Sequence, residues 1–189
     1  AGECRPMAAI HRLIGMGSDH LLDSLVGEQR QDISEAHGRY YRALHDQIRA
    51  LPGAAELVCR VKAAGGRVVL ASSAQPRDLD AMLGALGAGD AIDHVVSSGD
   101  VGSSKPAPDI FAKALEACQV HPTRAVVVGD TVWDVRAASQ AGIGAVAVQT
   151  GGQARQELEQ AGALAVYADC SEILERWPVT PLASVLEEN

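Results

Sequence analysis

The chain has 189 residues, 47% of them hydrophobic and only 3% aromatic, which predicts one domain, with at most a small appended one, and an aliphatic core. A formal net charge of −8 at pH 7 argues against nucleic acid or an anionic membrane surface as a general partner. A small phosphate ligand remains compatible with this charge, because a metal, a lysine and backbone N–H groups can make its site locally positive.

The four cysteines are widely scattered and form no Cys-x-x-Cys pair. This pattern favours buried thiols in a reducing cytosol over a disulfide framework or a zinc site. We expect neither a signal peptide nor a membrane span, and therefore a cytoplasmic protein. The cysteines are Cys4, Cys59, Cys118 and Cys170.

Residues 1–50 carry helical signals and no strand signal. A short amphipathic turn precedes the glycines at 15 and 17, and Ser18-Asp19 suits the start of a helix that runs to Val26. A longer polar helix is expected over 28–49. Its apolar stripe consists of Ile33, Ala36, Tyr40, Leu44 and Ile48.

From Leu51-Pro52-Gly53 onward, predicted strands alternate with predicted helices. This alternation indicates an α/β fold with a doubly wound parallel sheet. The final residues, 178–189, have weak periodicity and are expected to fray or to be partly disordered. Strands are predicted at 67–71, 92–96, 125–128, 144–148 and 164–167, and helices at 54–64, 76–86, 109–118, 131–141, 153–161 and 170–176.

The stretch from Ala125 to Asp134 organises the rest of the chain. Its β-branched run predicts a buried parallel strand, so that Asp130 lies at the carboxyl end of the strand and Asp134 on the first turn of the next helix. Ligands bind at this edge of open parallel sheets, and two carboxylates there suit Mg²⁺. The alternative is structural: Asp130 caps the helix and Asp134 favours its positive end.

Two further loops carry polar groups to the same edge. Ser72 and Ser73 follow the strand at 67–71, where a hydroxyl and free backbone N–H groups can bind a phosphate oxygen, or where they can cap the helix led by Pro76. Lys105 stands in Lys-Pro-Ala-Pro-Asp, where the prolines restrict the backbone and the lysine can neutralise carboxylate and phosphate. The alternative for Lys105 is an idle surface lysine.

Together these residues resemble motifs of the haloacid dehalogenase superfamily. Ser72, Lys105 in Lys-Pro-Ala-Pro-Asp-Ile-Phe, and Gly129-Asp130-x-x-x-Asp134 occur in the family's order. His11-Arg-Leu-Ile-Gly-Met-Gly-Ser-Asp resembles the helical cap of the phosphoglycolate-phosphatase-like and β-phosphoglucomutase-like branch. The resemblance implies a cap over 1–50, a Rossmannoid core over 51–177 and a tail over 178–189.

One family motif is absent. The nucleophile of the family lies in Asp-x-Asp-Gly-Thr after the first core strand, whereas Asp78-Leu-Asp80 lies in a predicted helix without Gly-Thr. By resemblance, the missing strand belongs between the strands that end at Ser72 and Asp130, and its loss leaves two buried edges unpaired. We expect the natural protein to be longer; the alternative is that something else fills the gap. A continuous sheet would contradict both.

The resemblance implies a Mg²⁺-dependent phosphatase that acts on a small phosphorylated metabolite through an aspartyl-phosphate, formed on an aspartate upstream of this sequence. Ser72 and the backbone at Ser73 would bind the phosphoryl group, and Lys105 would offset its charge. Asp130 would bind Mg²⁺ directly, and Asp134 directly or through water.

The cap implies a role for one arginine. Arg12 and the loop at 15–18 could close over the substrate and exclude water, although Arg12 suits a solvated helix residue equally well. The sequence leaves open which metabolite is bound and how many copies assemble.

Three other functions stay open. A sugar phosphomutase belongs to the same branch, and a catalytically inactive scaffold or fragment agrees with the missing nucleophile. A dehalogenase fits less well, since paired carboxylates suit metal-dependent phosphoryl chemistry. The receiver fold of response regulators lacks both the cap and the Lys-Pro-x-Pro-Asp loop.

Overall fold

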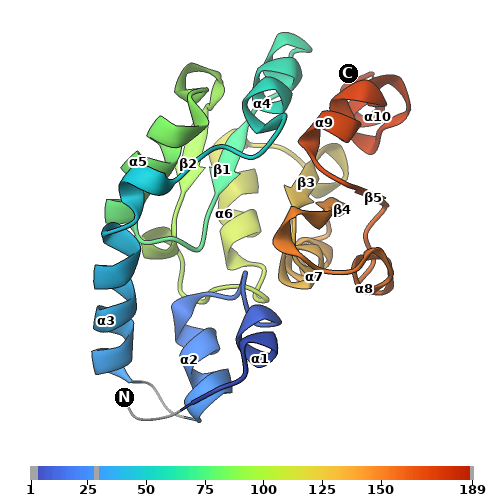
Figure 1. Cartoon of the computed structure of the whole chain (residues 1–189). Coiled ribbons are helices and arrows are strands. Elements are labelled where there is room, and N and C mark those ends of the chain that lie inside the picture. The colour runs from blue at the N-terminus through green and yellow to red at the C-terminus, as the bar shows by residue number, and fades with distance from the viewer. Residues whose placement is uncertain (1–3, 28–29, 188–189) are drawn as a thin grey trace.

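The computed structural model describes residues 4–27 and 30–187, with an α/β core beside a small group of helices (Figure 1). The strands are β1 (Val69–Ala71), β2 (His94–Val96), β3 (Val126–Gly129), β4 (Gly144–Val148) and β5 (Ala165–Tyr167). The α-helices are α1 (Met7–His11), α2 (Ser18–Val26), α3 (Gln31–Arg42), α4 (Ala54–Ala63), α5 (Pro76–Leu86), α6 (Asp109–Cys118), α7 (Val132–Gln140), α8 (Arg155–Gln160), α9 (Cys170–Glu175) and α10 (Pro181–Glu187). The 3₁₀ turns are η1 (His45–Gln47), η2 (Gly89–Ala91), η3 (Ser98–Asp100), η4 (Pro122–Arg124), η5 (Gln149–Gly151) and η6 (Trp177–Val179).

All the strands pair in parallel, but they form two separate sheets. β1 pairs only with β2, and β3, β4 and β5 pair in that order. Within the described residues, no backbone pairing joins β1 to β3. The predicted parallel α/β fold is confirmed, and so is the expected break between these two strands.

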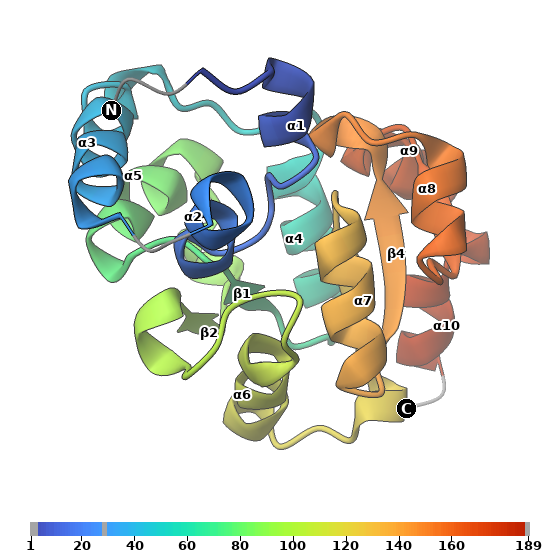
Figure 2. The same cartoon turned by 90° about the horizontal axis from the view of Figure 1, so that it is seen from below.

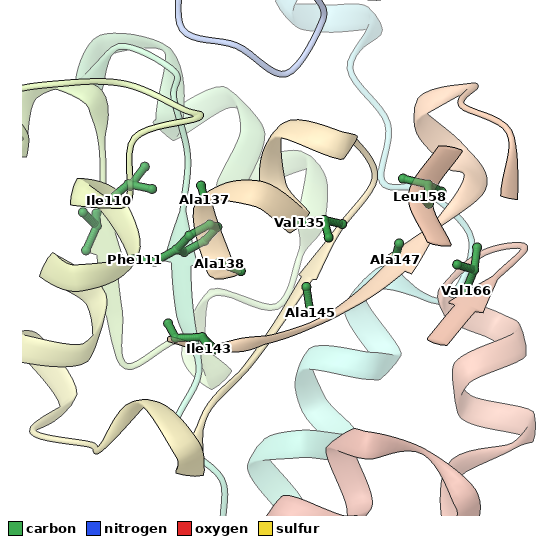
Figure 3. Packing of buried hydrophobic residues seen from close by; sticks show 11 residues of the cluster. Ile110, Phe111, Val135, Ala137, Ala138, Ile143, Ala145, Ala147, Leu158 and Val166 are labelled. Carbon is green, nitrogen blue, oxygen red and sulfur yellow. The ribbon is translucent and has the colours of Figure 1, made fainter. Parts of the chain in front are cut away.

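The two sheets nevertheless share one hydrophobic core. Its buried side chains come from both sheets and from α6, α7 and α8 (Figure 3). Ile110 of α6 and Val135 of α7 are each 1% exposed, which places them at the centre of this layer. A second cluster joins Leu57 of α4 to Ile173 of α9. The sheets therefore form one layer between helices, interrupted at its middle.

The interruption leaves β3 less buried than its sequence predicts. β4 has a neighbour on each side and its residues from Ala145 to Val148 are buried, whereas Val128 of β3 is 37% exposed. The prediction of a buried strand at 125–128 was wrong in this respect. The reason is that β3 has a hydrogen-bonded neighbour on only one edge.

The described part of residues 1–50 contains α1, α2, α3 and η1 and no strand, in agreement with its predicted helical character, but the expected long helix over 28–49 is shorter. α3 ends at Arg42 and η1 follows, while residues 28 and 29 lie outside the described part of the chain. The expected apolar stripe was also wrong in part, because Tyr40 is 75% and Leu44 50% exposed. Tyr41 is half-buried instead and packs edge-on against the ring of His45.

The junction between this helical group and the core involves α5. α3 lies beside α5 in two perpendicular views (Figures 1 and 2). At the end of the group, His45 Nε2 lies 3.4 Å from Asp78 Oδ1, a buried carboxylate in the first turn of α5. Asp78 therefore belongs to this contact, and its helical setting agrees with the prediction that Asp78-Leu-Asp80 is not the family's nucleophile loop.

The prediction that residues 178–189 fray was wrong for the part that the structure describes, which forms η6 and α10. Thr180 is fully buried and accepts a hydrogen bond from Ala183 N at 3.2 Å, which caps α10. Leu182 and Ala183 are buried in the second cluster, so tertiary packing orders a segment whose periodicity is weak. Only residues 188 and 189 of the predicted tail lie outside the described range.

The expectation for the cysteines was wrong in part. All four are free thiols, in agreement with the absence of a disulfide framework, but Cys118 alone is buried, Cys170 is half-buried, and Cys4 and Cys59 are exposed. Of the helices described here, none has the length and apolar content required to cross a bilayer.

Candidate active site

The first part of the site lies at the carboxyl end of β1. Ser72 N donates to Val96 O at 2.9 Å, which extends the β1–β2 pairing by one residue, and Ser72 Oγ accepts from Ala74 N at 3.1 Å. Ser73 Oγ is buried and has no hydrogen-bond partner among the described residues. Neither serine caps α5, because Gln75 is its N-cap residue and makes no side-chain capping bond. The alternative of a helix cap is thereby excluded.

The second part is the first turn of α7. Thr131 N and Oγ1 donate to Asp134 Oδ2 at 3.1 and 2.6 Å, and Asp134 N donates to Thr131 Oγ1 at 3.3 Å. This reciprocal arrangement is a capping box, which satisfies backbone groups that the helix start leaves free. A Cβ atom on Gly129 would lie 2.4 Å from Asp134 Cβ, so only glycine permits this approach. Asp134 thus has the structural role considered from sequence, while Thr131, not Asp130, is the cap.

Lys105 joins the first-turn carboxylate from the loop after β2. Lys105 Nζ donates to Asp134 Oδ1 at 2.7 Å, and both side chains are 9% exposed. The lysine precedes a cis peptide bond to Pro106, whose carbonyl accepts from Gln140 Nε2 of α7 at 3.2 Å. Lys105 is therefore a buried, paired cation and not an idle surface lysine.

Asp130 is the second carboxylate at this point of the sheet. Burial raises its pKa above the ordinary value, the charge of Asp134 raises it further, and Lys105 opposes the rise. Since burial and a neighbouring negative charge act against the ionised form, a cation bound beside Asp130 would lower this pKa again.

The structure thus brings three of the predicted site residues together: Lys105, Asp130 and Asp134. Ser72 and Ser73 lie at the end of β1, on the other side of the break in the sheet, at the same carboxyl edge. The signal for Thr131, which the sequence argument missed, was present as Thr-x-x-Asp before a helix, a capping-box pattern.

Arg12 has a different setting. It lines a groove of about 810 Å³ bounded by α1, α7 and α8, and its carbonyl accepts from Trp133 Nε1 at 3.2 Å. In the described part of the chain, no hydrogen bond or ion pair connects Arg12 with Ser72 or Lys105. A role for Arg12 in substrate binding stays a prediction.

Asp130 and Asp134 supply hard oxygen ligands of the kind that Mg²⁺ prefers. Both oxygens of Asp134 already accept hydrogen bonds, so Asp130 is the better placed for a direct bond. Among the described residues, no cluster of three or more His, Cys, Asp or Glu side chains forms a complete metal site. The pair therefore fits part of a Mg²⁺ coordination shell, with waters and further oxygens needed to complete it.

Comparison with known proteins identifies the family. Residues 2–142 match the family model of haloacid dehalogenase-like hydrolases. The chain belongs to this family. A hydrolase of known structure from Pseudomonas syringae is 33% identical with a TM-score of 0.85, covering 92% of this chain and 83% of its own.

Curated relatives indicate the branch. The chain is 36% identical to the protein CbbY of Cereibacter sphaeroides over 137 residues, 70% of this chain and 59% of that protein. It is 32% identical to phosphoglycolate phosphatase of Rhodospirillum rubrum over 122 residues, 65% of this chain and 50% of that protein. These relatives are of the phosphoglycolate-phosphatase-like kind that the sequence motifs resemble, and the chain spans about half the length of the curated relatives it matches.

The buried ion pair predicts a large effect of Asp134→Asn on stability. The substitution removes the carboxylate to which the buried Lys105 ammonium is hydrogen-bonded, and breaking a buried ion pair typically costs about 3–5 kcal/mol. Urea denaturation measures the change. Glu116→Gln, which breaks the exposed Lys113–Glu116 pair, is the matched control and should leave the free energy of unfolding unchanged within error. Equal effects of the two substitutions on the free energy of unfolding would contradict the role of Asp134 as the partner of a buried lysine.

The raised pKa of Asp130 predicts a pH-dependent stability. A carboxyl with a raised pKa binds its proton more tightly in the folded state, so its contribution to stability falls as pH rises above the ordinary value of 3.8. Asp130→Asn should therefore raise Tm at pH 7 in the presence of EDTA, and the gain should shrink as pH approaches 3.8. Asp80→Asn, at an exposed position, is the control. A Tm loss for Asp130→Asn at pH 7 would contradict the electrostatic account.

Proposed function

We propose that this chain is part of a Mg²⁺-dependent phosphatase that hydrolyses a phosphate monoester of a small metabolite. The observation that carries the proposal is the buried contact of Lys105 with Asp134 beside the partly buried Asp130, at the carboxyl edge of a parallel layer. Phosphoglycolate phosphatase and glyceraldehyde 3-phosphate phosphatase among the relatives support the same substrate class.

Asp130 and Asp134 would hold the metal ion, Asp130 directly and Asp134 through a water molecule. When bound, Mg²⁺ would supply the positive charge that orients a phosphate and reduces its repulsion from a carboxylate. The bonds from Thr131 and Lys105 fix the Asp134 carboxylate at two oxygens, so the protein positions this group before any ligand arrives. Preorganised charge of this kind is what phosphoryl transfer requires.

Ser72, Ser73 and Lys105 would bind the phosphoryl oxygens. The Ser73 hydroxyl is buried without a partner in the described chain, so a phosphate oxygen would satisfy it. Lys105 holds its ammonium group at Asp134 through a buried bond, which places a fixed positive charge beside the two carboxylates. These contacts would bind the transferring group from both sides of the break in the sheet.

The nucleophile would be an aspartate upstream of this sequence, on a strand between β1 and β3. Its carboxylate oxygen would attack phosphorus, the ester P–O bond would break, and a second upstream carboxyl group would give its proton to the leaving alcohol. Water would then hydrolyse the aspartyl-phosphate to release inorganic phosphate and restore the aspartate. The two unpaired edges and the partial coverage of the relatives support this proposal. The 189-residue chain alone would then be an inactive scaffold.

The proposal is tested with the longest natural form of the protein, including any residues that precede this sequence. Phosphate release from a panel of small phosphate monoesters should require Mg²⁺ and stop with EDTA. Lys105→Met should reduce kcat by about 10²-fold or more, because it removes charge stabilisation in the transition state. Lys113→Met, at an exposed lysine, should retain normal kcat.

Circular dichroism checks that each variant is folded. Equal kcat for the two lysine variants, or Mg²⁺-independent release, would contradict the proposed function.

A further inference from the structure

The turn η5, which follows β4, passes directly over Asp130. A Cβ atom on Gly151 would lie 2.3 Å from Asp130 O and 3.0 Å from Asp130 Cγ. The backbone of the turn therefore packs closely against Asp130 and leaves no room for a side chain at 151. Thr150 is the residue that precedes this close approach in the chain.

The turn is held by contacts on both sides. Gln149 N donates to Ala168 O at 3.2 Å, which ties its start to the residue after β5. Gly152 N donates to Gln149 O at 3.0 Å and closes the turn. Gln153, which is 9% exposed, accepts from Val132 N at 2.7 Å through Oε1 and so connects the turn to the start of α7. Thr150 is consequently presented by a fixed segment and not by a free loop.

The hydroxyl of Thr150 is buried, and its hydrogen-bonding capacity is not satisfied by the described residues. Thr150 Oγ1 has no well-formed hydrogen bond within the described chain. It nevertheless lies close enough to Asp130 to lower the pKa of that carboxyl, against the larger effects of burial and of Asp134. A buried hydroxyl without a good partner destabilises a fold, and such groups persist where a ligand or a reacting group uses them.

We propose that Thr150 is a positioning residue whose hydroxyl donates to the Asp130 carboxylate and turns one of its oxygens toward the bound cation. The inference rests on the proposed function, since it takes Asp130 as a metal ligand. Three observations support the inference: the close approach of Gly151 to Asp130, the buried hydroxyl of Thr150 and the contacts that fix the turn. Hydrogen bonds from such outer residues orient metal-binding carboxylates and tune metal affinity.

A structural role and a positioning role predict different results for Thr150→Val. Valine has nearly the same shape as threonine, so it fills the same space and removes only the hydroxyl. If the hydroxyl were needed for folding, Tm of the metal-free protein would fall. If it serves Asp130, the metal-free Tm should stay the same or rise, because an underused buried polar group has been removed.

The experiment is a titration of the full chain with Mn²⁺. Binding is monitored by water-proton relaxation, which detects weak binding of this paramagnetic ion. Thr150→Val should raise the Kd for Mn²⁺ by about 10-fold or more, as loss of an outer-shell bond commonly does. Thr150→Ser, which keeps the hydroxyl, should restore most of the affinity. Thr123→Val, at an exposed threonine, is the matched control and should not change Kd. Tm without metal is measured for every variant.

The possible results distinguish failure of the role inferred for Thr150 from failure of the proposed metal site. An unchanged Kd for Thr150→Val overturns this inference, while loss of Mn²⁺ binding in Asp130→Asn would leave the proposed function in place. A metal-free Tm loss that Thr150→Ser does not rescue assigns Thr150 a structural role and also overturns it. Absence of Mn²⁺ binding in the unsubstituted protein overturns the proposed metal site and this inference together.

Discussion

The backbone edges of β1 and β3 are the constraint on which this structure depends. Among the residues that the structure describes, each strand pairs on one side only, although both contribute to one hydrophobic core beneath α6 and α7. Unpaired N–H and C=O groups in such a position are costly unless water or another strand satisfies them. A parallel strand between β1 and β3 would join the two sheets. It would also carry its own loop to the carboxyl edge, between Ser72 at the end of β1 and Asp130 at the end of β3.

The contact between Lys105 and Asp134 is the ionic link across this divided core. It ties the loop after β2 to the first turn of α7, and the capping box of Thr131 fixes the same carboxylate from its other oxygen. One aspartate therefore stabilises a helix, pairs a buried lysine and lies beside the Asp130 carboxylate. Burial and the charge of Asp134 disfavour the ionised form of Asp130. The carboxylate that is proposed to bind the metal ion therefore lowers the stability of the fold.

Much of the fold followed from the sequence because strand and helix periods alternate clearly after Leu51, and motif order placed Ser72, Lys105, Asp130 and Asp134 at one edge. The failures have physical causes. Tyr40 and Tyr41 are adjacent on a polar helix, and it is Tyr41 that packs against His45 and is half-buried. α10 is ordered by the packing of Leu182, which local periodicity does not reveal. Thr150 has no sequence signal at all, since its importance comes from the close approach of η5 to Asp130.

Amide hydrogen exchange at β1 and β3 tests most directly whether a further strand lies between them in the natural protein. The account predicts that amides of 69–71 and 126–129 that face the break exchange at least about 10-fold more slowly in the longest natural form than in the 189-residue chain, because an inserted strand protects them. Amides of β4, which pair on both sides in the present structure, provide the internal reference. Equal exchange at β1 and β3 in the two forms would contradict the account.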